Sequence, residues 1–396
     1  MNMKYFGLTM STDKVLDKYL GEILVLSGKI YDLKELGSRE VQSSITIMQF
    51  LENLGFTVHL PYMDMHTAFR AESGNGKFTV GFLAEYDALP NGHSCGHNLI
   101  SAWAAGSAAV LKDMVQDVRI VVIGTPSEEG LGEYAGSKVR MVADGVFDDI
   151  NIVFGMHPDD RWAAGSKALA DLTLRLEFTG KSSHGADSPE SSVNALDAAV
   201  TTYSAINSLR SWAKHDKHLV VGMIFREAGQ ATNVVPEKAI LDVEIRSTST
   251  DFVKTFSRKV MKLATGISDG YGTKLITFEI TPLYDSYKPN LTMDSIIEEE
   301  MRKLGLDPVN VNQLQDLPSG STDEANVSYA APTGHIDIKI GYPGIPGHSD
   351  EFREASKPEK ASESLRLGII ATVNTVLRIH NDKLYDDIIE EFNRGK

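Results

Sequence analysis

Three short stretches of this chain are continuously apolar after a polar first residue, which is the pattern of strands buried on both faces of a sheet. They lie at 79–84, 119–124 and 151–156. Helices are expected before and between these strands, because apolar or small residues recur there at helical spacing, at 12–27, 40–54 and 99–115. Strands that alternate with helices in this way predict an α/β domain.

The middle of the chain has a different pattern. Residues 172–178 alternate between apolar and polar side chains, so this strand is expected to have one solvated face. The elements predicted after it are a helix, two strands, a helix and a strand, at 190–212, 219–226, 239–246, 250–268 and 274–281. The order β-α-β-β-α-β is that of a ferredoxin-like α+β domain.

Two domains are therefore expected, in keeping with a length of 396 residues. Residues 168–288 should form the inserted ferredoxin-like domain, and residues 1–167 and 289–396 should together form the α/β domain. A strand at 335–340 and a closing helix at 358–380 are expected in the second part of the α/β domain.

Composition narrows the class of protein. The formal net charge of −15 disfavours a nucleic-acid partner, because phosphate binding needs a basic face. No run approaches the length of a membrane-spanning helix, and the N-terminal residues are too polar for a signal peptide, so we expect a cytoplasmic protein without a membrane partner. A single cysteine, Cys95, cannot build a disulfide framework, so it is either a small buried residue or a chemical participant.

The densest group of chemically able side chains follows the strand at 79–84. Glu85 and Asp87 come first, and Cys95 and His97 follow where a helix begins. Ligands collect at such strand ends in open α/β sheets. Cys95 and His97 flank one glycine, so a thiolate and an imidazole can converge on one ion. Taken alone, a Cys-x-His pair fits a structural role equally well.

Other predicted strands end in similar residues. Glu128 and Glu129 follow the strand at 119–124, His157 follows the strand at 151–156, and His348 lies between glycine-rich turns. Adjacent glutamates are normally solvated, but here a buried strand directly precedes them. If one binds metal and the other faces water, the pair supplies an electrophile and a general base. Sites offering Cys, His, Glu and His ligands together predict a metal centre.

With these motifs, the sequence resembles the M20 family of metallopeptidases and amidohydrolases over nearly its full length. The similarity is closest to the branch of N-acyl-amino-acid amidohydrolases, aminobenzoyl-glutamate hydrolases and small dipeptidases. That branch carries an acidic-x-Asp-Ala-Leu-Pro segment and a His-x-Cys-Gly-His segment, as here at 85–90 and 93–97. The resemblance implies a phosphorylase/hydrolase-like α/β catalytic domain with a mixed sheet, and an inserted lid and dimerisation domain. It also implies an enzyme that hydrolyses amide or peptide bonds.

The resemblance further implies two divalent metal ions per subunit. Glu128 would act as the general base, and Asp87 would orient the ligands from behind. Imidazole, thiolate and carboxylate ligands suit zinc, manganese, nickel or cobalt, and ligand type alone does not select among them. The ligands that the resemblance implies are Cys95, His97, Glu129, His157 and His348.

Residues of the inserted domain match the family's lid motifs. The resemblance implies that His184 and Asn233 donate hydrogen bonds to the developing oxyanion, and that Arg246 clamps a substrate carboxylate. The local sequence alone would rather make His184 a loop histidine bonded to backbone. In such enzymes these lid residues often serve the partner subunit's site, so a homodimer through the lid domain is implied.

The segment 320–328 also matches a family segment near the active site. Ser321 and Thr322 could hold the substrate there, or they could cap a helix, and both roles can hold at once. Two positions depart from the family's patterns. Asn98 stands where many amidohydrolases of the branch carry Asp, and Glu85 stands where other branches carry a metal-binding His, so Cys95 and His97 must fill the ligand set.

The sequence therefore predicts hydrolysis of an N-acyl amino acid or dipeptide by a metal-activated water. Aminobenzoyl-glutamate and N-acetyl-diaminopimelate remain open as substrates, because no pattern marks the acyl pocket. Two other hypotheses are a cysteine hydrolase that pairs Cys95 with His97 or His93, and a non-catalytic metal-binding regulatory protein.

Overall fold

The computed structural model describes all residues except 1–10, 185–188, 212, 214–217, 319 and 395–396. The chain forms two compact units. The first comprises Met1–Lys167, Lys288–Gln315 and Val327–Lys396, and the second comprises Ala168–Tyr287 and Asp316–Asn326. No helix among the described residues is both long enough and apolar enough to cross a membrane.

The first unit contains a mixed eight-stranded sheet in the order β1-β2-β4-β3-β5-β12-β6-β11. Its central strands β4, β3, β5 and β12 run parallel, because helices return the chain between them. The mixed α/β architecture predicted from the sequence is confirmed. The strands are β1 (Thr57–His59), β2 (Phe69–Ser73), β3 (Phe78–Ala84), β4 (Val118–Gly124), β5 (Ile152–Asp159), β6 (Ala163–Ala164), β11 (Val309–Asn310) and β12 (Thr333–Lys339).

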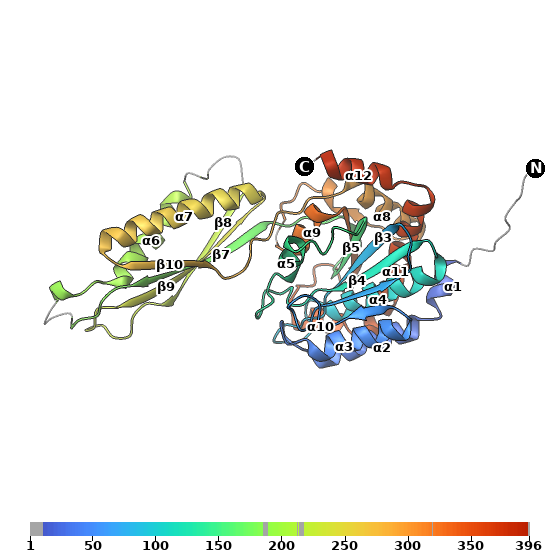
Figure 1. Ribbon diagram of the computed structural model, residues 1–396, viewed down its shortest axis with the longest axis horizontal. Coiled ribbons are helices and arrows are strands. Elements are labelled where there is room, and N and C mark those ends of the chain that lie inside the picture. Colours follow the sequence, from blue (N-terminus) through green and yellow to red (C-terminus); the bar gives the residue numbers. More distant parts are fainter. Residues whose placement is uncertain (1–10, 185–188, 212, 214–217, 319, 395–396) are drawn as a thin grey trace, which may run out of the picture. The chain divides into compact units, whose positions relative to one another are not determined.

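Helices cover both faces of this sheet (Figure 1). The largest core lies between the sheet and α4, which packs against α2 and α11 so closely that a Cβ on Gly106 would come 2.8 Å from Ile23 Cδ1. A smaller core lies on the other face, where α5 packs. The helices are α1 (Thr12–Leu16), α2 (Leu20–Leu33), α3 (Val41–Asn53), α4 (His97–Met114), α5 (Ser137–Ala143), α8 (Leu291–Lys303), α9 (Glu324–Ala330), α10 (Asp350–Ala355), α11 (Pro358–Asn381) and α12 (Tyr385–Arg394), with a short 3-10 turn at Val311–Gln313.

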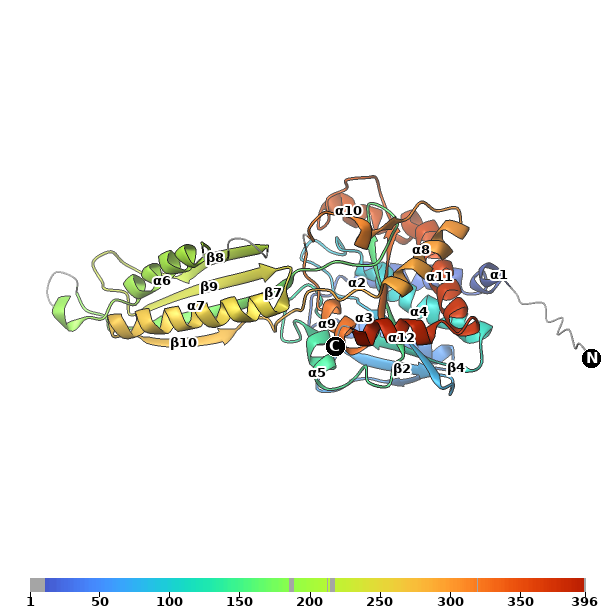
Figure 2. The ribbon, with the colours of Figure 1, turned by 90° about the horizontal axis from the view of Figure 1, so that it is seen from above.

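The second unit contains a four-stranded antiparallel sheet in the order β10-β7-β9-β8. Its two long helices, α6 and α7, lie side by side on one face and enclose their own core (Figures 1 and 2). The chain order of these elements is the ferredoxin-like order expected from the sequence. They are β7 (Ala170–Thr179), a 3-10 turn (Pro189–Ser191), α6 (Ala195–Leu209), β8 (Leu219–Glu227), β9 (Lys238–Ser247), α7 (Thr250–Tyr271) and β10 (Lys274–Glu279).

Two features differ from the sequence-based expectation. The single helix expected over 12–27 is divided into α1 and α2, and the turn between them is tied down by Lys18 and Tyr19, which both donate to Asp113. Residues Asp316–Asn326 cluster with the second unit rather than with the returning α/β segment. Asn326 shows why, since its amide donates to Asp285 Oδ2 at 2.8 Å.

Candidate active site

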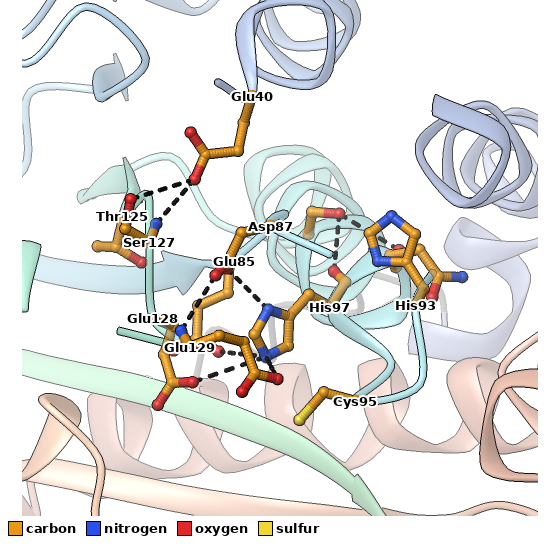
Figure 3. A network of polar contacts seen from close by, with 12 residues as sticks. Glu40, Glu85, Asp87, His93, Cys95, His97, Thr125, Ser127, Glu128 and Glu129 are labelled. Carbon is orange, nitrogen blue, oxygen red and sulfur yellow. Dashed lines mark hydrogen bonds and ion pairs between the residues drawn. The ribbon is translucent and has the colours of Figure 1, made fainter. Parts of the chain in front are cut away.

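Three of the predicted ligands, Cys95, His97 and Glu129, lie close together in segments that follow the central strands β3 and β4 (Figure 3). Ligand atoms of His157 and His348 lie near the same cysteine. Parallel pairing of β3 with β4 aligns Ala84 with Gly124, so the segments that follow these strands leave the sheet together. His157 lies near the end of β5 and His97 begins α4. Gly96 has φ +82°, and a Cβ there would come 2.5 Å from Pro158 Cγ, so glycine allows the turn before α4 to approach β5.

His97 is the centre of the cluster. Its ring is fully buried, and its Nδ1 is 2.8 Å from Asp87 Oδ1. The other ring nitrogen, Nε2, faces three carboxylates, those of Glu85, Glu128 and Glu129, at 3.7, 3.8 and 3.8 Å. Asp87 therefore orients the ring so that Nε2 points into the cluster, as a carboxylate behind a metal-binding histidine does.

Cys95 joins the remaining predicted ligands to this centre. Its Sγ lies 3.2 Å from His157 Nε2. Ligand atoms of Cys95, His97 and His157 lie within 4.8 Å of one another, as do those of Cys95, Glu129 and His348. His348 Nε2 is 3.6 Å from Glu129 Oε1. The thiol is thus common to two sets of ligand atoms, each suited to one ion.

The donor set can be tested for its fit to metal. His97 Nε2 and Glu129 Oε1 are both buried and, within the described part of the chain, have no hydrogen-bond partner. Buried polar atoms of native proteins are normally satisfied, so atoms without a partner in one cluster indicate a missing group. Thiolate, imidazole and carboxylate ligands are those of zinc and related divalent ions. The residues present fit a metal centre.

Comparison with known proteins places this site in a family. Residues 167–271 match the family model M20_dimer, the peptidase dimerisation domain. An Xaa-Arg dipeptidase from Mus musculus is 29% identical over 401 residues, which cover 95% of this chain and 90% of the relative. A p-aminobenzoyl-glutamate hydrolase subunit from Escherichia coli (strain K12) is 28% identical over 344 residues, which cover 80% of this chain and 70% of the relative. These matches support an M20 family amidohydrolase.

Solved structures share the fold of this M20 chain. An aminobenzoyl-glutamate utilization protein from Klebsiella pneumoniae has a TM-score of 0.71 at 18% identity, covering 92% of this chain and 98% of its own. The YXEP protein of Bacillus subtilis, a dinuclear metal binding peptidase from the M20 family, has a TM-score of 0.64 at 19% identity, covering 91% and 99%. M20 hydrolases act on amide or peptide bonds, so the predictions of family and of an enzyme for such bonds are confirmed.

The M20 site also contains residues that the sequence did not identify. Lys138 of α5 is fully buried, and its Nζ lies 2.8 Å from Glu85 Oε1. Lysine is rarely buried, and nothing in the local sequence marks this one as an exception. Glu85, which the sequence analysis excluded as a ligand, groups with His97 and Glu128 within 4.8 Å. Glu85 Oε2 faces His97, whereas Glu85 Oε1 forms the ion pair with Lys138.

Carboxylates crowd this site and shift one another's pKa. Burial raises the pKa of Glu128, and the neighbouring Glu85 raises it further, while Lys138 opposes both. Burial, opposed by His97, brings the pKa of Glu129 to about 7. Burial also raises the pKa of the Cys95 thiol, and His97 opposes it. Groups that are costly to ionise when buried become stable as anions beside divalent cations.

The other predicted site residues lie in the second unit. His184 forms an isolated bridge with Val234 next to Asn233, and both His184 and Asn233 are exposed. Arg246 on β9 is held by two carboxylates, with Nε 3.1 Å from Asp171 Oδ2 and a terminal nitrogen 2.7 Å from Glu244 Oε1.

Ser321 and Thr322 lie in the segment Asp316–Asn326. Thr322 Oγ1 accepts a hydrogen bond from the Glu324 N–H at 3.2 Å, at the start of α9. That contact is the helix-capping arrangement considered from the sequence. The substrate-binding role of Ser321 and Thr322 stays a prediction.

Proposed function

We propose that this M20 hydrolase cleaves the amide bond of an N-acyl amino acid or a dipeptide, with Glu128 as general base beside two divalent ions. The observation that carries the proposal is the arrangement around His97 Nε2. This buried nitrogen has no hydrogen-bond partner among the described residues, and it faces Glu128 Oε2 at 3.8 Å. A potential metal ligand and a potential general base therefore lie next to each other.

The ions would be held by the five predicted ligands. Cys95 would contribute to both, with His97 and His157 on one side and Glu129 and His348 on the other, in keeping with the two groups of ligand atoms. When bound, the ions would supply Lewis-acid polarisation of the scissile carbonyl and a lower pKa for a bound water. Zinc, manganese, nickel and cobalt all suit this donor set.

Glu128 would move the proton. Its carboxylate would take a proton from the attacking water and donate it to the leaving nitrogen. A raised pKa suits this work, because it makes the Glu128 carboxylate a stronger base than an ordinary glutamate. Asp87 would keep the His97 ring fixed during turnover, since it binds Nδ1 directly.

Residues of the second unit would bind the substrate. His184 and Asn233 would donate to the developing oxyanion, and Ser321 and Thr322 would contact the substrate. Arg246 would bind the substrate's carboxylate, and Asp171 and Glu244 would hold its guanidinium in a fixed orientation. The match to a dimerisation domain supports a homodimer formed through this unit.

A substrate panel tests the proposal. The metal-free enzyme would be loaded separately with zinc, manganese, cobalt or nickel and offered N-acyl amino acids, dipeptides with basic and neutral C-terminal residues, aminobenzoyl-glutamate and N-acetyl-diaminopimelate. At least one class should be hydrolysed, and chelation should abolish the turnover. If no metal supports hydrolysis of any member, the proposed substrate class is wrong.

A cysteine hydrolase is the second candidate, and one distance favours it. The 3.2 Å between Cys95 Sγ and His157 Nε2 is that of a nucleophile and its base. Burial raises the pKa of the thiol, which opposes formation of the nucleophilic thiolate. Iodoacetamide should modify Cys95 only after chelation if the residue is a metal ligand. A chelated enzyme that keeps its activity until it is alkylated would favour the nucleophile.

A further inference from the structure

The turn that carries Glu128 has a strained backbone. Ser127, the residue before it, has φ +60°. This left-handed region is unfavourable for a residue other than glycine, because its Cβ comes too close to the following carbonyl oxygen. Such a conformation persists only where the surrounding structure holds it. The position of the Glu128 carboxylate therefore depends on whatever fixes Ser127.

The side chain of Glu40 accepts a hydrogen bond from the backbone of Ser127 (Figure 3). Glu40 directly precedes α3 and its side chain is completely buried. Its Oε1 accepts a hydrogen bond from the Ser127 N–H at 2.8 Å, and its Oε2 accepts one from Thr67 Oγ1 at 3.1 Å. Because both oxygens are engaged, the carboxylate is fixed in place and can act as an anchor for the turn.

A second carboxylate holds the other side of the same turn. Asp87 Oδ2 accepts a hydrogen bond from the Glu129 N–H at 3.0 Å. The backbone N–H groups of the residues on either side of Glu128 thus each donate to a different buried carboxylate. Asp87 also binds His97, so only Glu40 can be changed without disturbing a predicted ligand's partner.

The residues before Glu40 pack against the turn from the same side. Ser38 Oγ lies 2.9 Å from Ser127 Oγ. A Cβ added to Gly37 would lie 3.1 Å from that same Oγ. The segment 37–40 therefore holds Ser127 by its N–H, by its hydroxyl and by close packing.

We infer that Glu40 is a positioning residue for hydrolysis: it holds Ser127 so that the Glu128 carboxylate faces the predicted metal cluster. The inference rests on the proposed function, in which Glu128 is the base. Glu40 contacts neither water nor substrate in this role. It acts as a hydrogen-bond acceptor, so its charge is not required and glutamine can replace it.

The test uses substitutions in the full chain loaded with metal. Glu40→Ala removes the acceptor, Glu40→Asp withdraws it by one methylene, and Glu40→Gln keeps an oxygen at the same reach. Glu35→Ala is the control, because the Glu35 carboxylate likewise accepts hydrogen bonds from backbone N–H groups, but from those of Gln42 and Ser43 in α3. The readouts are kcat, KM, metal content per subunit and hydrogen exchange of residues 125–130.

Glu40→Ala and Glu40→Asp should lower kcat by about 10- to 100-fold, since small displacements of a catalytic group have effects of that size. KM should change by no more than about twofold, because ground-state binding is untouched. Metal content should stay at the wild-type value, and residues 125–130 should exchange faster. Glu40→Gln should have the kcat of the wild type. Glu35→Ala should leave both kcat and the hydrogen exchange of residues 125–130 unchanged.

Wild-type kcat in Glu40→Ala and Glu40→Asp overturns the inference. So does a Glu40→Gln enzyme as slow as Glu40→Ala, a loss of metal with the loss of kcat, or an equal effect of Glu35→Ala. If Glu40→Ala does not fold, Glu40→Asp and Glu40→Gln carry the comparison. A fully active Glu128→Gln enzyme overturns the proposed function and this inference together, whereas normal Glu40→Ala turnover beside an inactive Glu128→Gln overturns this inference alone.

Discussion

Single residues of this site are held by partners that lie outside the predicted ligand set. Asp87 fixes the ring of His97, and Glu40 fixes the backbone before Glu128. Cys95 belongs to two groups of potential ligand atoms, one with His97 and His157 and one with Glu129 and His348. The effect of a substitution should therefore depend on whether it removes a ligand, a ligand's partner or the base.

Cys95→Ser should weaken metal binding. A serine hydroxyl is a poor substitute for a thiolate shared by two groups of ligand atoms, so each subunit should lose at least one ion on dialysis against a buffer without metal. Elemental analysis of the dialysed protein checks this. A variant that keeps the wild-type metal content would contradict the assignment of Cys95 as a ligand.

The stability of the metal-free protein should depend on pH through Glu40. Burial, with Asp87 nearby, raises the pKa of Glu40 from 4.5 to about 7. The folded protein then binds a proton that the unfolded chain releases, so this group's contribution falls as pH rises from about 4.5 to 7, by at most about 3 kcal/mol. The stability of Glu40→Gln relative to the wild type should therefore increase as the pH rises across that window, because glutamine does not titrate. Unfolding midpoints at pH 5, 6, 7 and 8 measure the difference, and a difference independent of pH would refute the shift.

Much of the residue-level site could be predicted, because ligands follow buried strands at 79–84, 119–124 and 151–156 and carry side chains with distinctive chemistry. Glu40 and Lys138 could not. Each is a charged residue whose burial depends on partners distant in sequence, Ser127 for one and Glu85 for the other. The residues next to Glu40 and Lys138 in the sequence do not indicate these pairs.

At the level of elements, strand ends and helix starts bring the site together. Helix α5 contributes Lys138 from the face of the sheet opposite α4, whose first residue is His97. The fold class could be predicted because buried strands and amphipathic helices have different periodicities. The turn that separates α1 from α2 could not, because it depends on the distant Asp113.

Lys138→Met should destabilise the first unit. The substitution leaves the Glu85 carboxylate buried without its cation, and loss of one partner of a buried pair costs about 3–5 kcal/mol. Arg140→Met, an exposed position of the same helix, is the control and should change stability little. The double variant Lys138→Met with Glu85→Gln should recover part of the loss. Urea unfolding of the four proteins decides, and equal stability of Lys138→Met and Arg140→Met would contradict the pairing.

For the whole molecule, the second unit carries a surface that suits the proposed association. Its strand β8 is an edge strand, and the exposed apolar residues Val220 and Ile224 lie on it. The neighbouring helix α6 exposes Val200 and Tyr203. Unpaired edges and exposed apolar residues of this kind are typical of surfaces that pair with a second chain.

The protein should therefore be a dimer in solution, with twice the chain mass of 43.3 kDa by light scattering. Val200→Asp should shift it toward the monomer, because a charge would be buried in the interface. Val25→Asp on α2, a more exposed apolar position of the first unit, should not. A monomeric wild type, or equal dissociation by both substitutions, would place the association elsewhere.

The central claim is that Glu128 moves the proton at a two-metal site. The most direct measurement is kcat of Glu128→Gln, with metal content determined on the same sample. We predict that the variant keeps two ions per subunit and loses turnover by about 10²–10⁴-fold, the usual contribution of a general base. Metal-replete Glu128→Gln with wild-type kcat would contradict the claim.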